Sequence, residues 1–154
     1  MAVSGRTLTE IFENRVARSA DRVAMKVKTD GEWRAIDYRE YDDQARAIAN
    51  GLISLGVEKG DTVALLSTNR PEWHIADLGI LLTGAVTVPV YVTNSSSQVA
   101  HVVGHSHARV IFVENQLQLD KVDAARKQLP DLKRVVVMSG EGASNDLVMS
   151  FDQL

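Results

Sequence analysis

The feature that most constrains the fold of this sequence is a series of short apolar runs separated by segments with helical periodicity. The runs cover residues 62–66, 86–92, 110–113 and 135–137. The first is continuously apolar, which indicates a strand covered on both faces. Strands that alternate with helices at this spacing are typical of a parallel sheet with right-handed crossovers. The sequence therefore predicts an α/β fold with a mostly parallel, doubly wound sheet.

Helices are predicted between these strands. One begins near Pro71, which a first helical turn tolerates, and runs to about Thr83. Because this helix is apolar nearly all round, we expect it to be deeply buried. A short helix is capped within Ser95–Ser97, and another begins near Leu117 and stops at Pro130.

The first part of the chain has a different pattern. Thr7 and Glu10 form a capping box before a short amphipathic helix. Strand-like residues then flank Asp30-Gly31, a dipeptide typical of two-residue turns, so an N-terminal antiparallel β-hairpin is predicted. Asp37 caps the next helix, and Gly56 ends it in the left-handed conformation that glycine adopts without strain.

The chain is predicted to be one unit in four parts. These are a leading helix at 1–20, the hairpin at 21–37, an α/β region at 38–138, and a loop with a helix start at 139–154. In the last part, residues 147–149 resemble a short strand and Ser150 resembles a helix cap. A helix that starts at the end of the sequence indicates an architecture that continues beyond Leu154. We therefore expect an incomplete domain.

The most apolar stretch, residues 78–92, is too short to cross a membrane. It has about 15 residues where a membrane helix needs about 20, and Gly84 and Pro89 interrupt it. We interpret it as a buried helix followed by a strand and predict no transmembrane segment. Pro89 cannot donate to a ladder, so its strand should be an edge strand or irregular.

Charge and composition exclude several classes of protein. The net charge is −3, and the 17 Lys and Arg residues are scattered among 20 acidic residues, which argues against nucleic acid as a partner. The absence of cysteine excludes disulfides and thiolate sites. Residues 1–5 show no secretory signal. These features suit a protein that is cytoplasmic, or peripheral at a membrane.

Two polar segments follow predicted strands, where doubly wound sheets bind ligands. Residues 67–70, Ser-Thr-Asn-Arg, lead into a helix N-terminus that could hold an anion beside Arg70. The alternative, which we favour, is a capped loop with a solvated arginine. Residues 93–97, Thr-Asn-Ser-Ser-Ser, lack the glycines and lysine of a phosphate cradle. We interpret them as hydroxyl groups that cap a helix.

Histidines and paired aspartates are the remaining candidates. His101 and His105 share a helix face and could bind zinc, but a zinc site needs a third or fourth ligand. His107 lies near the expected helix end, so we favour surface histidines beside a turn. Asp42 and Asp43 are adjacent and predicted to be solvated. No phosphate loop, nucleotide fingerprint or nucleophile elbow occurs, and we assign no catalytic, cofactor-binding or metal-binding residue.

Several segments, in this order and spacing, resemble the N-terminal region of adenylate-forming (AMP-binding) ligases over about residues 7 to 138. They are residues 33–40, 45–57, 59–65, 69–73, 84–91 and 106–113. The most specific are the Gly-Asp-x-Val strand at 60–63, Asn-Arg-Pro-Glu-Trp at 69–73 and the Val-Pro strand around Pro89. The form of 69–73 and the Thr-Asn-Ser-Ser-Ser tail resemble the fatty-acid–CoA ligases (long-chain acyl-CoA synthetases).

The resemblance implies an enzyme that uses Mg-ATP to convert a fatty acid to an acyl-adenylate and then transfers the acyl group to coenzyme A. Adenylate is a good leaving group and carboxylate oxygen is not. The family's phosphate loop, ribose-holding aspartate and catalytic lysine have no counterpart here. We therefore expect this stretch to be inactive alone, to bind none of these cofactors by itself, and to supply core, part of the acyl-pocket wall and, in some members, a subunit contact.

Two other functions stay open. The first is a non-catalytic interaction module that kept the scaffold, as a homodimer or with a separate catalytic chain. The second is an independent nucleotide or flavin binder of flavodoxin-like architecture, which the absence of a phosphate loop disfavours.

Overall fold

The computed structural model describes residues 5–29, 31–140 and 146–154. The helices are α1 (Leu8–Ser19), α2 (Tyr38–Ser54), α3 (Pro71–Leu82), α4 (Ser96–His105) and α5 (Gln116–Ala125), with short 3-10 helices η1 (Arg126–Gln128) and η2 (Phe151–Gln153). The strands are β1 (Val23–Thr29), β2 (Glu32–Asp37), β3 (Thr62–Leu66), β4 (Val86–Val90), β5 (Val110–Val113), β6 (Arg134–Val137) and β7 (Val148–Ser150).

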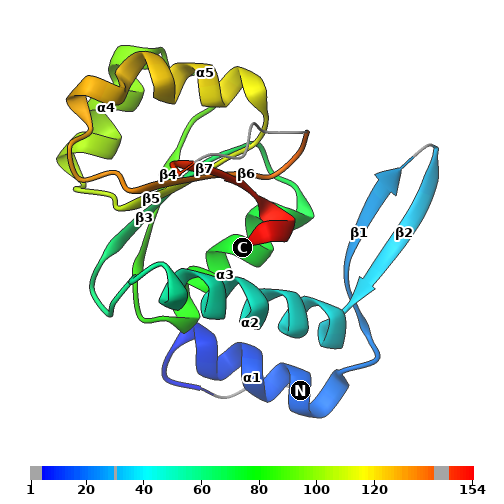
Figure 1. The fold of residues 1–154 in the computed structure, drawn as a ribbon. Coiled ribbons are helices and arrows are strands. Elements are labelled where there is room, and N and C mark those ends of the chain that lie inside the picture. Colours follow the sequence, from blue (N-terminus) through cyan, green and yellow to red (C-terminus); the bar gives the residue numbers. More distant parts are fainter. Residues whose placement is uncertain (1–4, 30, 141–145) are drawn as a thin grey trace.

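The strands β3 to β7 form one parallel sheet in the order β4-β3-β5-β6-β7. Helices α2 and α3 cover one face of this sheet, and α4 and α5 cover the other (Figure 1). The chain is therefore α/β with a doubly wound parallel sheet, as the alternation of apolar runs and helical segments predicts.

Burial on both faces explains why the central strands are apolar throughout. In β5, Val110 and Phe112 belong to the apolar cluster under α2 and α3, while Ile111 and Val113 belong to the cluster under α4 and α5. Every residue of β5 is at most 2% exposed. Successive side chains of a strand point to opposite faces, so β5 contributes to two cores at once.

The edge strand is shorter than the sequence predicts. Pro89 lies in β4, which pairs only with β3 among the described strands and so needs no N–H on its outer side. The strand ends at Val90 rather than at residue 92. Similarly, α5 ends at Ala125 and a 3-10 turn replaces the last helical turn expected before Pro130. The Arg126 guanidinium donates to two loop carbonyls there, at 2.6 and 2.9 Å.

The hairpin of β1 and β2 stands apart from the five-stranded sheet (Figure 1). Thr29 pairs with Glu32, which leaves a two-residue turn at positions 30 and 31. Gly31 has a φ of 87°, in the left-handed region that the predicted turn requires. Asp30 lies outside the described residues. The N-terminal antiparallel hairpin is thus confirmed.

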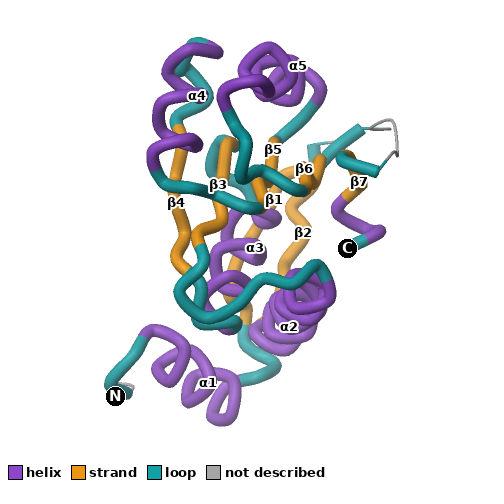
Figure 2. Tube along the Cα trace, turned by 60° about the vertical axis from the view of Figure 1, so that its left-hand side comes forward, coloured by secondary structure: helices purple, strands orange, loops and turns teal. Residues whose placement is uncertain are grey.

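Helix α1 packs against the outer side of α2, away from the sheet, as Figures 1 and 2 both show. Its cap differs in part from the predicted capping box. The Thr7 hydroxyl accepts the Glu10 N–H at 3.1 Å, but the Glu10 carboxylate accepts the N–H of Arg6 rather than that of Thr7. Phe12 packs edge-on against Tyr41 of α2, with ring centroids 4.8 Å apart.

The predicted ends of α2 are confirmed. The Asp37 carboxylate accepts the Glu40 N–H at 2.8 Å, and Gly56 has a φ of 79°. The Val57 N–H then donates to the Leu52 carbonyl at 3.0 Å, which turns the chain back towards the core.

Helices α2 and α3 lie close together at Gly79. A Cβ atom there would lie 2.7 Å from Ile48 Cγ2 and 3.0 Å from the Ala45 carbonyl oxygen. These distances are shorter than van der Waals contact, so the helix pair needs glycine at this position. The predicted deep burial of α3 is confirmed, with Ile75, Ala76 and Ile80 at most 2% exposed.

We predict that Gly79→Ala lowers the free energy of unfolding by about 1–3 kcal/mol, because the added methyl group forces α2 and α3 apart. Urea unfolding of the chain measures this loss. The matched control is Gly104→Ala in α4, where the nearest atom to a new Cβ is 3.3 Å away. In Gly104→Ala, the slightly tight contact of the new methyl group is offset by the higher helix propensity of alanine. The free energy of unfolding of this control should therefore stay within about 1 kcal/mol of wild type. Equal losses in both variants would contradict the close-approach argument.

Candidate functional site

The carboxyl ends of the parallel strands bring four loops to one edge of the sheet. The loops follow β3, β4, β5 and β6 and begin at Ser67, Tyr91, Glu114 and Met138. The helices after β3 and β5 lie on opposite faces of the sheet (Figure 1), so the crevice between these two strands is the switch point where doubly wound sheets bind ligands. This carboxyl edge is the candidate site.

At the switch point, the Glu114 carboxylate bridges the loops after β3 and β5. Glu114 Oε2 accepts the Thr68 N–H at 2.7 Å and the Thr68 hydroxyl at 2.8 Å. The Ser139 hydroxyl and N–H donate to the Glu114 carbonyl at 2.8 and 3.0 Å. The loops after β3, β5 and β6 are therefore tied together by Glu114.

The local charges favour the ionised form of Glu114. Burial raises the pKa of its carboxyl, but hydrogen bonds from Thr68 and the charge of Arg70 outweigh burial and hold the pKa below its ordinary value. Glu72 behaves in the same way, because burial is outweighed mainly by the bond from Arg70 and its pKa is also lowered. The edge thus carries two ionised carboxylates close to one guanidinium.

This arrangement corrects the expectation for residues 67–70. The Thr68 N–H and hydroxyl already donate to Glu114, so these two groups are not free for an external anion. Arg70 is not a solvated side chain either. Its Nε donates to Glu72 at 2.7 Å and its NH1 donates to the Ser139 hydroxyl at 3.2 Å.

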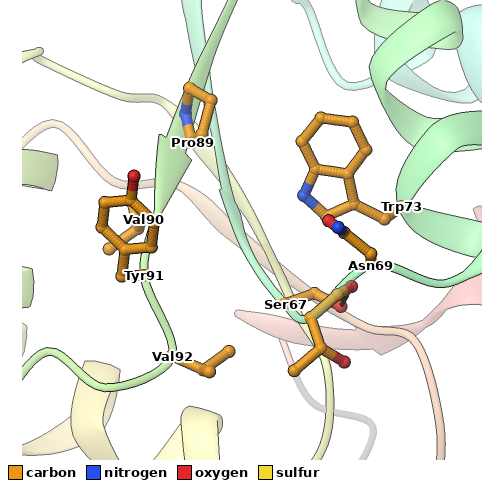
Figure 3. A pocket seen from close by; sticks show the side chains of 8 residues that line it. Ser67, Asn69, Trp73, Pro89, Val90, Tyr91 and Val92 are labelled. Atoms are coloured by element: carbon orange, nitrogen blue, oxygen red, sulfur yellow. Dashed lines mark hydrogen bonds between the residues drawn. The ribbon is translucent and has the colours of Figure 1, made fainter.

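Beside the switch point lies an apolar pocket of about 320 Å³. Figure 3 shows Asn69 and Trp73 on one side and residues 89–92 on the other. Ser67 and Thr68 complete the lining. Sequence reasoning missed this pocket, although it placed the Trp73 turn and the Pro89 strand next to each other in chain order. The signal available in the sequence was Tyr91, an aromatic residue just past an edge strand. In the structure, Tyr91 is 81% exposed.

A second hollow of about 530 Å³ separates the hairpin from the same edge. Both signs of charge line it. Arg34 pairs with Glu40, Arg70 pairs with Glu72, and Lys28 has no salt bridge among the described residues. The lining of this hollow holds three cationic side chains, Lys28, Arg34 and Arg70, and two carboxylates, Glu72 and Glu114.

The other predicted candidates lie away from the carboxyl-edge site or have structural roles. Ser95 and Gln98 form a reciprocal capping box at the start of α4, which confirms helix capping for residues 93–97. His107 Nδ1 lies 2.9 Å from an Asp131 carboxylate oxygen, beyond the end of α4. Among the described residues, no group of three or more His, Cys, Asp or Glu could hold a metal ion.

The expectation for Asp42 is wrong. Its side chain is only 15% exposed and accepts from Arg46 Nε at 3.0 Å, one turn along α2. Asp43 is exposed, as expected. In the part of the chain that the structure describes, no helix is long and apolar enough to cross a membrane.

We predict that Glu114→Gln lowers the free energy of unfolding by about 1 kcal/mol at neutral pH, because an amide cannot replace a charged acceptor of two Thr68 bonds and the site is partly exposed. The pKa of Glu114 is lowered on folding, so its contribution is present above the unfolded-state pKa of about 4.3 and disappears as pH falls through the lower, folded-state pKa.

Urea unfolding at neutral and acidic pH measures this dependence. The matched control is Glu58→Gln, which removes the same charge from an exposed carboxylate. If the Glu114 and Glu58 variants lose equal stability, or if the Glu114 difference persists in acid, the electrostatic account of this edge is wrong.

Comparisons with known proteins agree on one family. The family model described as AMP-binding enzyme matches residues 12–153. A long-chain-fatty-acid–CoA ligase of Xenopus laevis is 36% identical over 135 residues, which are 88% of this chain and 18% of that protein. A long-chain-fatty-acid–CoA ligase of Mycobacterium tuberculosis is 42% identical over 122 residues, or 79% and 20% of the two chains. This chain thus spans about a fifth of the length of these curated relatives.

Solved structures show the same fold. An anthranilate CoA ligase in complex with anthranoyl-AMP matches with a TM-score of 0.83 and 28% identity, over 94% of this chain and 27% of that one. The A-PCP didomain of a carboxylic acid reductase from Segniliparus rugosus, in complex with AMP, has a TM-score of 0.83 at 18% identity, over 97% and 26%. The second likeness is one of fold alone.

Proposed function

The chain belongs to the AMP-binding enzyme family, and we propose that residues 1–154 are the N-terminal portion of the large domain of an ATP-dependent fatty-acid–CoA ligase. In the complete enzyme, a fatty acid, ATP and coenzyme A give acyl-CoA, AMP and pyrophosphate. The observation that carries this proposal is the 42% identity, along 79% of the chain, with a long-chain-fatty-acid–CoA ligase. We propose a cytoplasmic or membrane-peripheral location for the enzyme.

The step of the reaction that these residues fit best is binding of the apolar part of the substrate. The pocket beside the switch point is walled by Trp73 and by the Pro89–Val92 segment, and its polar lining is limited to Ser67–Asn69. Removing an acyl chain from water gains about 25 cal/mol per Å² of apolar surface. A wall of this kind supports a role in holding the hydrocarbon portion of a carboxylic acid substrate.

The phosphates of ATP do not fit the carboxyl edge. The Thr68 N–H and hydroxyl already donate to Glu114, and Arg70 is paired with Glu72, so these groups are not free to bind a triphosphate. We therefore propose that the groups that bind Mg-ATP and coenzyme A belong to other residues of the complete enzyme. No catalytic step is assigned to this chain, and we expect it to be inactive alone.

A second candidate function is a non-catalytic interaction or dimerisation module. Large apolar side chains exposed at the surface favour it, because a partner that covered them would remove apolar area from water. Trp33 on the hairpin is 67% exposed, Tyr91 is 81% exposed and Ile53 on α2 is 57% exposed. The covering partner would be a second copy of the chain or a separate catalytic chain.

We predict that the purified 154-residue chain does not exchange radiolabelled pyrophosphate into ATP in the presence of Mg²⁺ and a long-chain fatty acid. The physical reason is that we place the groups that bind the triphosphate in other residues of the complete enzyme. A complete family ligase under the same conditions serves as the positive control. Exchange above the enzyme-free background would overturn the assignment of the ATP site to other residues.

The two candidate functions differ in solution behaviour. Sedimentation and urea unfolding of the same sample distinguish them. A defined dimer that unfolds cooperatively favours the interaction module. A product that aggregates favours a segment whose apolar surface is covered by the rest of the complete enzyme.

A further inference from the structure

Helix α4 carries two histidines on its solvent-facing side. His101 and His105 are four residues apart, and their rings stack with centroids 5.9 Å apart and planes inclined by only 10°. Both residues are exposed. Within the described part of the chain, neither imidazole takes part in a hydrogen bond or ion pair, so all four ring nitrogens are available to a ligand.

The helix holds this pair in place from its opposite side. Val99 and Val103 are at most 1% exposed and pack into the core under α4 and α5. The Ser95–Gln98 capping box secures the first turn, and the Ser106 N–H closes the last turn by donating to the Val102 carbonyl at 3.1 Å. The helix therefore fixes the backbone positions of the two histidines before any ligand arrives, and only the side-chain torsions are ordered on binding.

Neutral imidazoles one helical turn apart converge on a single cation when both rings rotate about their side-chain bonds. Imidazole nitrogen suits Cu²⁺, Ni²⁺ and Zn²⁺, and affinity for such ligands peaks at Cu²⁺ among the divalent first-row metals. Mg²⁺ prefers oxygen ligands. We propose that His101 and His105 form an exchangeable, two-histidine site for a nitrogen-preferring divalent transition metal, with water in the remaining coordination positions.

The third histidine of this region does not belong to the site. His107 has a φ of 55° and follows the end of α4, and its ring contacts Asp131. The described residues therefore provide two ligands rather than the closed set of a structural zinc site. The sequence alone disfavoured a metal here because a third ligand was missing, but a two-point chelate needs only the parallel pair. The site is independent of the ligase reaction proposed above.

Calorimetric titration of the chain with Ni²⁺ in a non-coordinating buffer tests the proposal. We expect one Ni²⁺ per chain and tighter binding of Cu²⁺. His101→Gln and His105→Gln should each weaken Ni²⁺ binding by on the order of tenfold or more. Each variant keeps one imidazole ligand, and water replaces the other, so the advantage of two linked ligands is lost. His107→Gln and His74→Gln are the matched controls and should bind as the wild type does.

Thermal unfolding provides the second measurement and checks that each variant folds. In the absence of metal, all four variants should unfold near the wild-type midpoint, because these side chains are exposed. Free Ni²⁺ at about one hundred times its dissociation constant should raise the wild-type midpoint by roughly 5 °C, and at the same Ni²⁺ concentration His105→Gln should reduce the rise to about half or less. Equal Ni²⁺ affinity in wild type and His105→Gln, or a loss in His107→Gln, would overturn the site.

Discussion

Two-sided burial of the central strands is the constraint on which the rest of the structure depends. Strands β3 and β5 lie side by side in the middle of the sheet, and their side chains alternate between two apolar clusters. Neither cluster is complete without its own pair of helices. The need to cover both faces therefore fixes where α2, α3, α4 and α5 lie. It also brings the loops after β3 and β5 to the same edge from opposite sides.

This constraint is local enough to be visible in the sequence. The apolar runs, the Asp37 cap, the Gly56 stop and the turn at Gly31 each depend on residues close together in the chain. Each is confirmed, except that the edge strand ends at Val90. The places where the prediction fails involve alternatives of similar energy. The Glu10 carboxylate can accept from either of two neighbouring N–H groups, and it accepts from Arg6. Asp42 forms an ion pair with Arg46 one turn away instead of being solvated. The last turn of α5 is replaced because Arg126 bonds two loop carbonyls.

The candidate site could be placed from the sequence but its chemistry could not. Parallel strands guarantee that residues 67–70 and residue 114 meet at one edge, and that part of the argument needs only the strand order. The contact between Glu114 and Thr68 joins residues far apart in sequence, so the hydrophobic periodicity of the sequence does not predict it. The result is an edge at which the Thr68 amide is satisfied by a carboxylate of the chain. The apolar pocket next to it likewise depends on two segments, around Trp73 and Tyr91, that only the packed sheet brings together.

The strand order also bears on how the sheet assembles during synthesis. Strands β3 and β4 are made first and pair with each other, and β5 then adds to the free side of β3. Strands β6 and β7 follow in turn, each beside the strand made just before it. No strand has to insert between two that are already paired. The sheet can therefore grow vectorially along one side as the chain leaves the ribosome, while β4 stays at its other edge from the start.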